Sequence, residues 1–165
     1  MQIKGMKIYV ASSWKNPRHR VIVNALRDRG AWVYDYRESN DWFHWEDLDP
    51  NYERWEPAVY LSALTTTDAS EAFWRDMSAL AEADAVVGLD PLGVSSALEL
   101  GWAVGHGRPV VLLVGDVVKP ELMAKMIPFR VCQLEDLIIT LESLVGQAGP
   151  VGHNKHEEQY HGKKN

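Results

Sequence analysis

Apolar residues follow two alternating patterns along the chain, short continuous runs and longer stretches at helical spacing. The runs are rich in β-branched and aromatic residues, which favour strands. They predict five strands, at 7–11, 31–36, 83–89, 109–114 and 129–132. The longer stretches carry apolar residues three and four positions apart and predict helices. These helices cover 16–30, 67–81, 95–106, 121–126 and 134–145, while 37–56 has no clear period.

Residues that begin or end helices support several of these boundaries. Gly30 is expected to close the first helix, whose apolar stripe includes Val21 and Leu26. Thr67–Asp68 is expected to cap the second helix, and Ser95 or Ser96 the third.

The alternation of strands and helices predicts an α/β fold. Strands joined through helices form right-handed crossovers, which produce a parallel sheet covered on both faces. Five such strands predict a flavodoxin-like, doubly wound, five-stranded parallel sheet in three αβα layers. Sheets of this kind bind ligands beyond the strand carboxyl ends, beside the first strand. The loops 12–16 and 90–96, and the segment from 37 onward, are therefore the expected ligand-binding segments.

Composition and charge limit the class of protein. The 165 residues predict one domain at 1–145 and a flexible polar tail at 146–165, whose three histidines have no spacing typical of a metal site. A net charge of -6 argues against nucleic-acid binding, although a helix N-terminus can still hold a phosphate group. A lone cysteine, Cys132, allows no internal disulfide. No apolar run suggests a membrane span or signal peptide, so a cytoplasmic protein is expected. No metal site is expected.

Glu99 is the strongest candidate for chemistry. It falls about one turn into the predicted helix 95–106, among apolar neighbours such as Leu98 and Leu100. A carboxylate in such a position is either paired with a cation or kept for function, and no Lys or Arg precedes it within helical reach. Function is therefore the favoured interpretation.

Just before Glu99, Gly93 allows a tight turn, and Ser95 and Ser96 place hydroxyls beside free helix amides. These residues predict an anion cradle. An ordinary serine N-cap is the simpler alternative.

Two further residues are candidates for a catalytic role. Asp76 lies on the helix before strand 83–89 and is either directed to the same end of the sheet or a solvent-facing acid beside Arg75. Tyr9 lies on the first strand, where a buried hydroxyl needs a partner that a carboxylate above the sheet would supply.

Aromatic and hydroxyl residues in the expected loops complete the candidate site. The segment Trp42–Trp45 is rich in flat rings that can stack a nucleobase, or that can pack on one another or on a second subunit. The candidate ligand-binding residues are Ser12, Ser13, Trp14, Phe43, His44, Trp45, Gly93, Ser95 and Ser96.

Three segments together resemble the nucleoside 2-deoxyribosyltransferase family, which includes the deoxynucleoside 5'-monophosphate N-glycosidases. They are KIYVASSW at 7–14, Asp76 followed by ADAVV at 83–87, and LELGWAVGHGRP at 98–109. The resemblance implies that Glu99 is a nucleophile on the sugar anomeric carbon and that Tyr9 contacts Glu99. It also implies that Asp76 corresponds to the aspartate that precedes the third strand in that family. A nucleoside or nucleotide substrate, no cofactor, and a homo-oligomer are implied as well.

The sequence departs from both branches of that family. Gly93 stands where the transferases have an aspartate that contacts the base, and the segment from Gly93 to Glu99 is two residues longer than in the hydrolases. Hydrolysis or transfer, and the identity of base and sugar, are therefore left open. A non-catalytic nucleotide-sensing module is an alternative on the same fold. A flavodoxin-like electron carrier or a phosphate-binding signalling domain is another, although loop 12–16 is a weak phosphate loop.

Overall fold

The computed structural model describes residues 2–38, 43–115 and 120–145. Its centre is a sheet of five parallel strands in the order β2-β1-β3-β4-β5. The strands are β1 (Lys7–Ser12), β2 (Trp32–Tyr34), β3 (Ala85–Leu89), β4 (Val110–Leu113) and β5 (Phe129–Val131). This is the order of a flavodoxin-like doubly wound sheet, which confirms the predicted fold.

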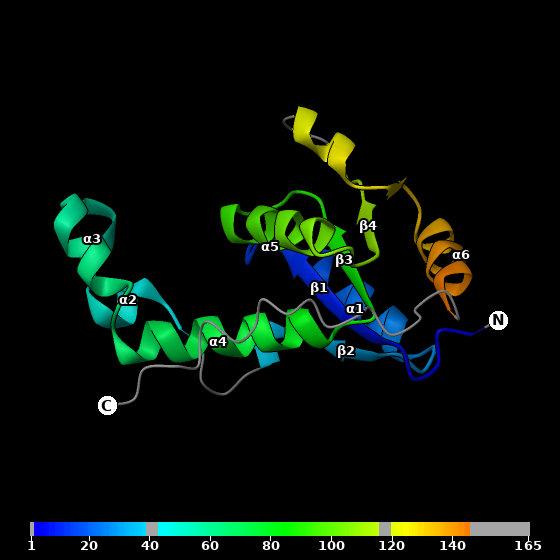
Figure 1. Ribbon diagram of the computed structural model, residues 1–165, viewed down its shortest axis with the longest axis horizontal. Helices are drawn as coiled ribbons and strands as arrows, with labels where there is room; N and C mark the ends of the chain where they lie inside the picture. The colour runs from blue at the N-terminus through cyan, green and yellow to red at the C-terminus, as the bar shows by residue number, and fades with distance from the viewer. Residues whose placement is uncertain (1, 39–42, 116–119, 146–165) are drawn as a thin grey trace.

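Helices cover both faces of the sheet (Figure 1). One face is covered by α1 (His19–Arg27) and α6 (Leu134–Leu144), the other by α4 (Thr67–Glu82) and α5 (Val94–Gly105). Shorter helical segments are α2 (Trp45–Leu48), α3 (Pro57–Ala63), η1 (Tyr36–Glu38), η2 (Tyr52–Arg54) and η3 (Leu122–Met126). Among the described residues, no helix is both long enough and apolar enough to cross a bilayer.

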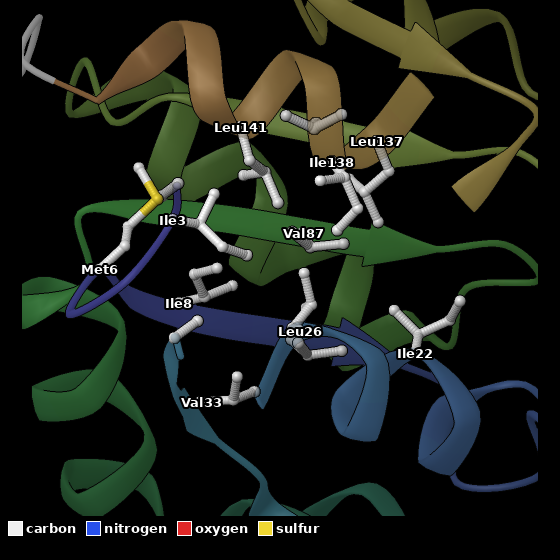
Figure 2. Close-up of a cluster of buried hydrophobic side chains, with 14 of the residues drawn as sticks. Ile3, Met6, Ile8, Ile22, Leu26, Val33, Val87, Leu137, Ile138 and Leu141 are labelled. Carbon is white, nitrogen blue, oxygen red and sulfur yellow. The ribbon is translucent and has the colours of Figure 1, made fainter. Parts of the chain in front are cut away.

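The alternation of side chains along β1 divides the core into two layers, because successive strand residues point to opposite faces. Ile8 and Val10 belong to the layer under α1 and α6. Figure 2 shows Ile8 in this layer, with side chains of β3 and α6. Tyr9 and Ala11 belong to the layer under α4 and α5. The β1 register therefore places the Tyr9 side chain on the same side of the sheet as the helix that carries Glu99.

Close packing of α5 on the sheet depends on Gly88 of β3. A Cβ atom at this position would lie 2.6 Å from Leu100 Cδ1 and 3.1 Å from Leu112 Cδ1, both nearer than normal contact. Leu100, the residue after Glu99, therefore packs its side chain directly on Gly88, in space that a larger residue would occupy.

The segment between β2 and α4 differs from the prediction. The structure contains α2, η2 and α3 in a region that the sequence indicated to be irregular or without an element. We call residues 43–66 the arm, because α3 lies far from the sheet at the outer end of α4 (Figure 1). Helix α3 begins at Pro57, a favourable first residue. Its apolar residues are spread around the helix and stay partly exposed, so they form no stripe that a periodicity argument detects.

Three predicted helix ends were also wrong. Helix α1 begins at His19, since the Asn16 side chain accepts a hydrogen bond from the Arg18 amide and holds a turn there. Gly30 ends this helix as predicted: its φ is +84°, its amide donates to the Arg27 carbonyl oxygen at 2.8 Å, and the Ala31 amide donates to that of Leu26 at 3.3 Å. Val21, which the sequence predicts to lie in the apolar stripe, is instead 63% exposed.

The other two errors concern N-caps. Thr66 caps α4 through its side chain, one residue earlier than predicted. Gly93 occupies the N-cap of α5 without a side-chain bond, which places Ser95 and Ser96 in the first turn.

Candidate functional site

Two tyrosines and two carboxylates meet on the α4/α5 side of the sheet. Tyr9 of β1 and Tyr34 of β2 are direct neighbours in the parallel register, and their rings stack with centroids 5.4 Å apart at 15°. The Tyr34 hydroxyl donates to Asp76 Oδ1 of α4 at 2.6 Å. The Tyr9 hydroxyl donates to the carboxylate of Glu99 on α5. The site therefore consists of two adjacent tyrosine–carboxylate pairs, drawn from two strands and two helices.

The electrostatics of this group single out Glu99. Burial is the main cause that raises its pKa to about 7, and the negative charge of Asp76 raises it further, against the hydrogen bond from Tyr9. Burial also raises the pKa of Asp76, opposed by the hydrogen bond from Tyr34 and the charge of Arg75. Glu99 therefore changes charge near neutral pH, as acid–base groups in active sites commonly do.

The two tyrosines act as fixed donors. Burial, with the charges of Glu99 and Asp76, raises the pKa of Tyr9 far above its ordinary value. Burial and the contact with Asp76 likewise raise the pKa of Tyr34. Both hydroxyls keep their protons at any ordinary pH, so they continue to orient the two carboxylates whatever the charge on Glu99.

The structure brings together the three residues that the sequence put forward for catalysis, and it adds Tyr34. Asp76 is partly buried and hydrogen-bonded to Tyr34, so it is not the solvent-facing acid of the alternative interpretation. Tyr34 was missed because nothing in its own segment distinguishes it from a core tyrosine. Its position opposite Tyr9 follows only from the pairing of β1 with β2.

The loop after β1 reaches the N-terminus of α5 through Ser13. A Cβ atom on Gly93 would lie 3.6 Å from Ser13 Cα and 3.8 Å from Ser96 Oγ, so these three residues are neighbours. Ser96 is buried and Ser95 is exposed in the first turn of α5. The amides of a first helical turn have no partner within the helix and favour anions. The predicted cradle therefore has Gly93 at its centre instead of a serine cap.

Ser12 lies apart from the carboxylates. Its side chain is buried on the α1 side of the sheet, where Oγ is 2.6 Å from His19 Nδ1 and 3.1 Å from the Tyr36 hydroxyl. His19 Nε2 is in turn 2.9 Å from Asp35 Oδ1. The hydroxyl of Ser12 is thus engaged inside the fold, whereas Ser13 lies beside Gly93 and its hydroxyl oxygen accepts from the Lys15 amide at 3.3 Å.

The aromatic residues of the candidate loop fall into two groups. Phe43 and Trp45 contact each other edge to face at 4.7 Å, and Trp45 also packs on Trp55 at 5.6 Å, so they form part of a small core within the arm. Trp14 instead contacts His44 with centroids 5.0 Å apart, and 43% of its surface is exposed. Trp14 and His44 therefore lie where the arm meets the loop after β1. Trp42 lies outside the described residues, as do His153, His156 and His161 of the tail.

One cation that the sequence analysis did not consider lies at the carboxyl edge. A Cβ atom on Gly115, just after β4, would lie 2.5 Å from Arg18 Nη1 and 2.9 Å from the Asp90 carbonyl oxygen. The guanidinium of Arg18 therefore lies between the ends of β3 and β4. Within the described ranges, no cluster of three or more His, Cys, Asp or Glu residues could hold a metal ion.

The fold and this site define a flavodoxin-like α/β protein with paired carboxylates beside β1. No family model matches the sequence, and no curated protein does. Among solved structures, it resembles a 2-deoxyribosyltransferase from Bacillus psychrosaccharolyticus, with a TM-score of 0.52 and 22% identity over 81% of this chain and 94% of that one.

Two other structures are similar. A conserved protein from Enterococcus faecalis has a TM-score of 0.56 and 18% identity, over 84% of this chain and 98% of that one. A CMP N-glycosidase from Clostridium botulinum has a TM-score of 0.46 and 12% identity, over 82% and 97%. The resemblance seen in the sequence is thus confirmed at the level of the fold, which this chain shares with a 2-deoxyribosyltransferase.

Proposed function

We propose that this protein cleaves or transfers at the N-glycosidic bond of a nucleoside or nucleoside 5'-monophosphate, with Glu99 as the nucleophile. The observation that carries the proposal is the Glu99 carboxylate, which is partly buried, accepts from Tyr9, has a pKa of about 7 and lies beside Asp76. The fold shared with a 2-deoxyribosyltransferase supports it.

The chemistry follows from the charge that develops on the sugar. As the C–N bond breaks, its electron pair leaves with the base and the anomeric carbon gains oxocarbenium character. A nearby carboxylate stabilises that positive charge and then bonds to the anomeric carbon. Water, or a second base, attacks the resulting glycosyl ester and releases Glu99. Two displacements give net retention at the anomeric carbon, as in retaining glycosidases.

Asp76 and Tyr9 have supporting roles in this mechanism. The hydrogen bond from Tyr9 orients the Glu99 carboxylate and favours its ionised form. The raised pKa of Asp76 makes it suited to hold a proton for the leaving base, or to bind a sugar hydroxyl. Tyr34 holds Asp76 in place from the adjacent strand.

The remaining residues provide binding. Glu99 is five residues beyond Val94, the first residue of α5, so their backbones lie about 7–8 Å apart along the helix axis, and the Glu99 side chain tilts back toward the cradle. A sugar whose anomeric carbon is at Glu99 can place its 5' end at this cradle, with Ser13, Ser95, Ser96 and the Gly93 turn around it. Trp14 and His44 would contact the base, while Ser12, Phe43 and Trp45 support the loops from inside.

The test is a product screen. Purified protein is incubated with ribo- and deoxyribonucleosides and with their 5'-monophosphates, each with and without a free acceptor base, and released base is measured by chromatography. Release that a Glu99→Ala variant lacks supports the proposal, and dependence on the acceptor separates a transferase from a hydrolase. A folded protein that binds nucleotides but releases no base from any of them would instead indicate the sensing module.

We also propose that the chain forms a homo-oligomer through the arm and the first half of α4. Large apolar side chains are exposed there, including Leu61 at 62% and Trp74 at 57%, beside an apolar depression of about 440 Å³ between α2 and α3. Exposed apolar surface of this extent is typical of subunit contacts. Light scattering should give a multiple of the 18.7 kDa chain mass.

A substitution locates this contact. Leu61→Glu is expected to reduce the mass to that of one chain, while Leu122→Glu, at an exposed apolar residue of η3, leaves it unchanged. A wild-type protein that stays monomeric at high concentration contradicts the proposal.

A further inference from the structure

Arg37, which follows β2, holds the loop after β1 by its carbonyl groups. Its Nη2 donates to the carbonyl oxygens of Ser13 and Trp14, both at 2.8 Å, and of Asn16 at 3.3 Å. The guanidinium carbon also lies 6.0 Å from the centre of the Trp14 ring and 5.8 Å from that of Tyr36. One side chain thus fixes three carbonyls of a four-residue segment.

The two residues before Arg37 hold the start of the same loop. The Tyr36 hydroxyl donates to the Ser12 carbonyl oxygen at 2.8 Å. Asp35 is 2.9 Å from His19 Nε2, and His19 Nδ1 is 2.6 Å from Ser12 Oγ. Burial raises the pKa of Asp35, but hydrogen bonds from His19 and the Arg37 amide outweigh it and the pKa lies below its ordinary value. The Asp35 carboxylate is therefore ionised at neutral pH and can hold its partners.

The three hydrogen bonds that Arg37 donates from Nη2 all go to this loop. Within the described part of the chain, Arg37 Nε is a buried polar atom with no hydrogen-bond partner. A buried N–H without a partner is unfavourable, and most such groups in proteins are paired. The hydrogen bond that Nε lacks is offset by those that Nη2 donates to three carbonyl oxygens in the same side-chain position.

The contacts of Arg37 also decide what the loop presents to the candidate site. In a planar peptide group the C=O and the following N–H point in opposite directions. Because the Ser13 carbonyl is directed to Arg37, the Trp14 amide is directed away from it. The backbone of Ser13 meanwhile lies against the Gly93 turn at the start of α5. Ser13 is therefore contacted both by Arg37, through its carbonyl oxygen, and by the Gly93 turn.

We propose that Arg37 is a positioning residue, which keeps loop 12–16 in the conformation that receives the substrate beside Glu99. This inference rests on the proposed function. Arg37 contributes to the affinity of the site for substrate and not to the step in which the bond breaks. Arg37 acts through the loop backbone and needs no contact with the substrate.

The experiment compares Arg37→Met with wild type in two measurements. Without ligand, hydrogen–deuterium exchange of the loop 12–16 amides should be at least about 10-fold faster in the variant, while β3 and β4 amides are unchanged. With the best substrate from the product screen, KM should rise by about 10- to 100-fold, while kcat stays within about 3-fold. Arg37→Lys should recover part of the affinity, because an ammonium can still donate to several carbonyls at one point.

Arg108→Met is the matched control. Arg108 also donates to backbone carbonyls, those of Ala81 and Ala83, but between the end of α4 and the start of β4. This variant should lose stability without any change in KM. Unchanged loop exchange in Arg37→Met, or an equal rise of KM in Arg108→Met, overturns the inference.

Arg37→Lys keeps the test decisive if Arg37→Met does not fold. A loss in kcat alone in the lysine variant also overturns the inference. If the wild type releases no base, the proposed function fails, while the exchange measurement still decides whether Arg37 holds the loop.

Discussion

Glu99→Gln is expected to reduce base release by about 10⁴-fold or more, since the glutamine amide cannot form the glycosyl ester. The amide has nearly the same shape and still accepts from Tyr9, so substrate affinity should change little. Release is measured by chromatography under single-turnover conditions, and affinity by calorimetry with the same substrate. A mass increase equal to one sugar on wild-type Glu99, absent from the variant, would identify the covalent intermediate directly.

The same substitution is expected to raise stability above pH 7. The pKa of Glu99 is about 7 in the folded chain, above its ordinary value of 4.5, so unfolding between these pH values releases a proton. The wild type therefore loses stability as pH rises from about 4.5 to 7, whereas the glutamine variant does not. At pH 8 the variant should be more stable by about 1–3 kcal/mol in urea unfolding, with little difference at pH 4.

Glu71→Gln on α4 is the control for both measurements, because Glu71 is exposed on the same helix as Asp76. It should leave release and the pH dependence of stability as in wild type. Retention of more than about one tenth of wild-type release by Glu99→Gln would contradict a nucleophilic role, because losing a nucleophile costs far more.

The second large effect is expected in the pH dependence of kcat/KM. A glutamate nucleophile must be ionised to attack, so kcat/KM should rise about 10-fold for each pH unit below its pKa. Above that pKa, kcat/KM levels off if Asp76 binds a sugar hydroxyl and falls again if Asp76 must hold a proton for the leaving base. The midpoint of this rise in wild type is expected near 7, the pKa of Glu99. Rates are measured from pH 4.5 to 9 with substrate well below KM, so that the profile reports the free protein.

Asp76→Asn should move that midpoint to lower pH. The negative charge of Asp76 is the second cause of the raised Glu99 pKa, after burial, and asparagine removes it while still accepting from Tyr34. The shift is partial because burial remains. The maximal rate should also fall, since the proton or sugar contact of Asp76 is lost, so the midpoint and not the height is the diagnostic quantity.

Asp68→Asn, an exposed carboxylate in the first turn of α4, is the control and should leave the midpoint in place. An unchanged midpoint in Asp76→Asn, or a shift to higher pH, would show that the two carboxylates do not interact as the structure indicates.

The importance of Glu99 in the site could be predicted from the sequence alone. A carboxylate within an apolar helical stretch is costly unless it has a partner or a role, and this argument needs only the local sequence. For Asp76 the local sequence left two interpretations open, because Arg75 beside it allowed a solvated pair. The contact with Tyr34 decides between these two interpretations. Tyr34 lies forty-two residues away in the chain, yet its hydroxyl is 2.6 Å from Asp76 Oδ1. Ser12 and Ser13 were equivalent in the sequence, and the alternation along β1 sends the Ser12 side chain to His19.

By itself, the sequence determined the order of strands and helices, the parallel sheet and the position of Glu99, because periodicity and local burial are properties of neighbouring residues. Tertiary structure decided what lies across from each residue. Pairing of β1 with β2 set the Tyr9–Tyr34 stack, Gly88 set the approach of α5, and Arg37 held the loop after β1. Contacts between distant segments depend on strand register and helix packing, which no local pattern in one sequence records.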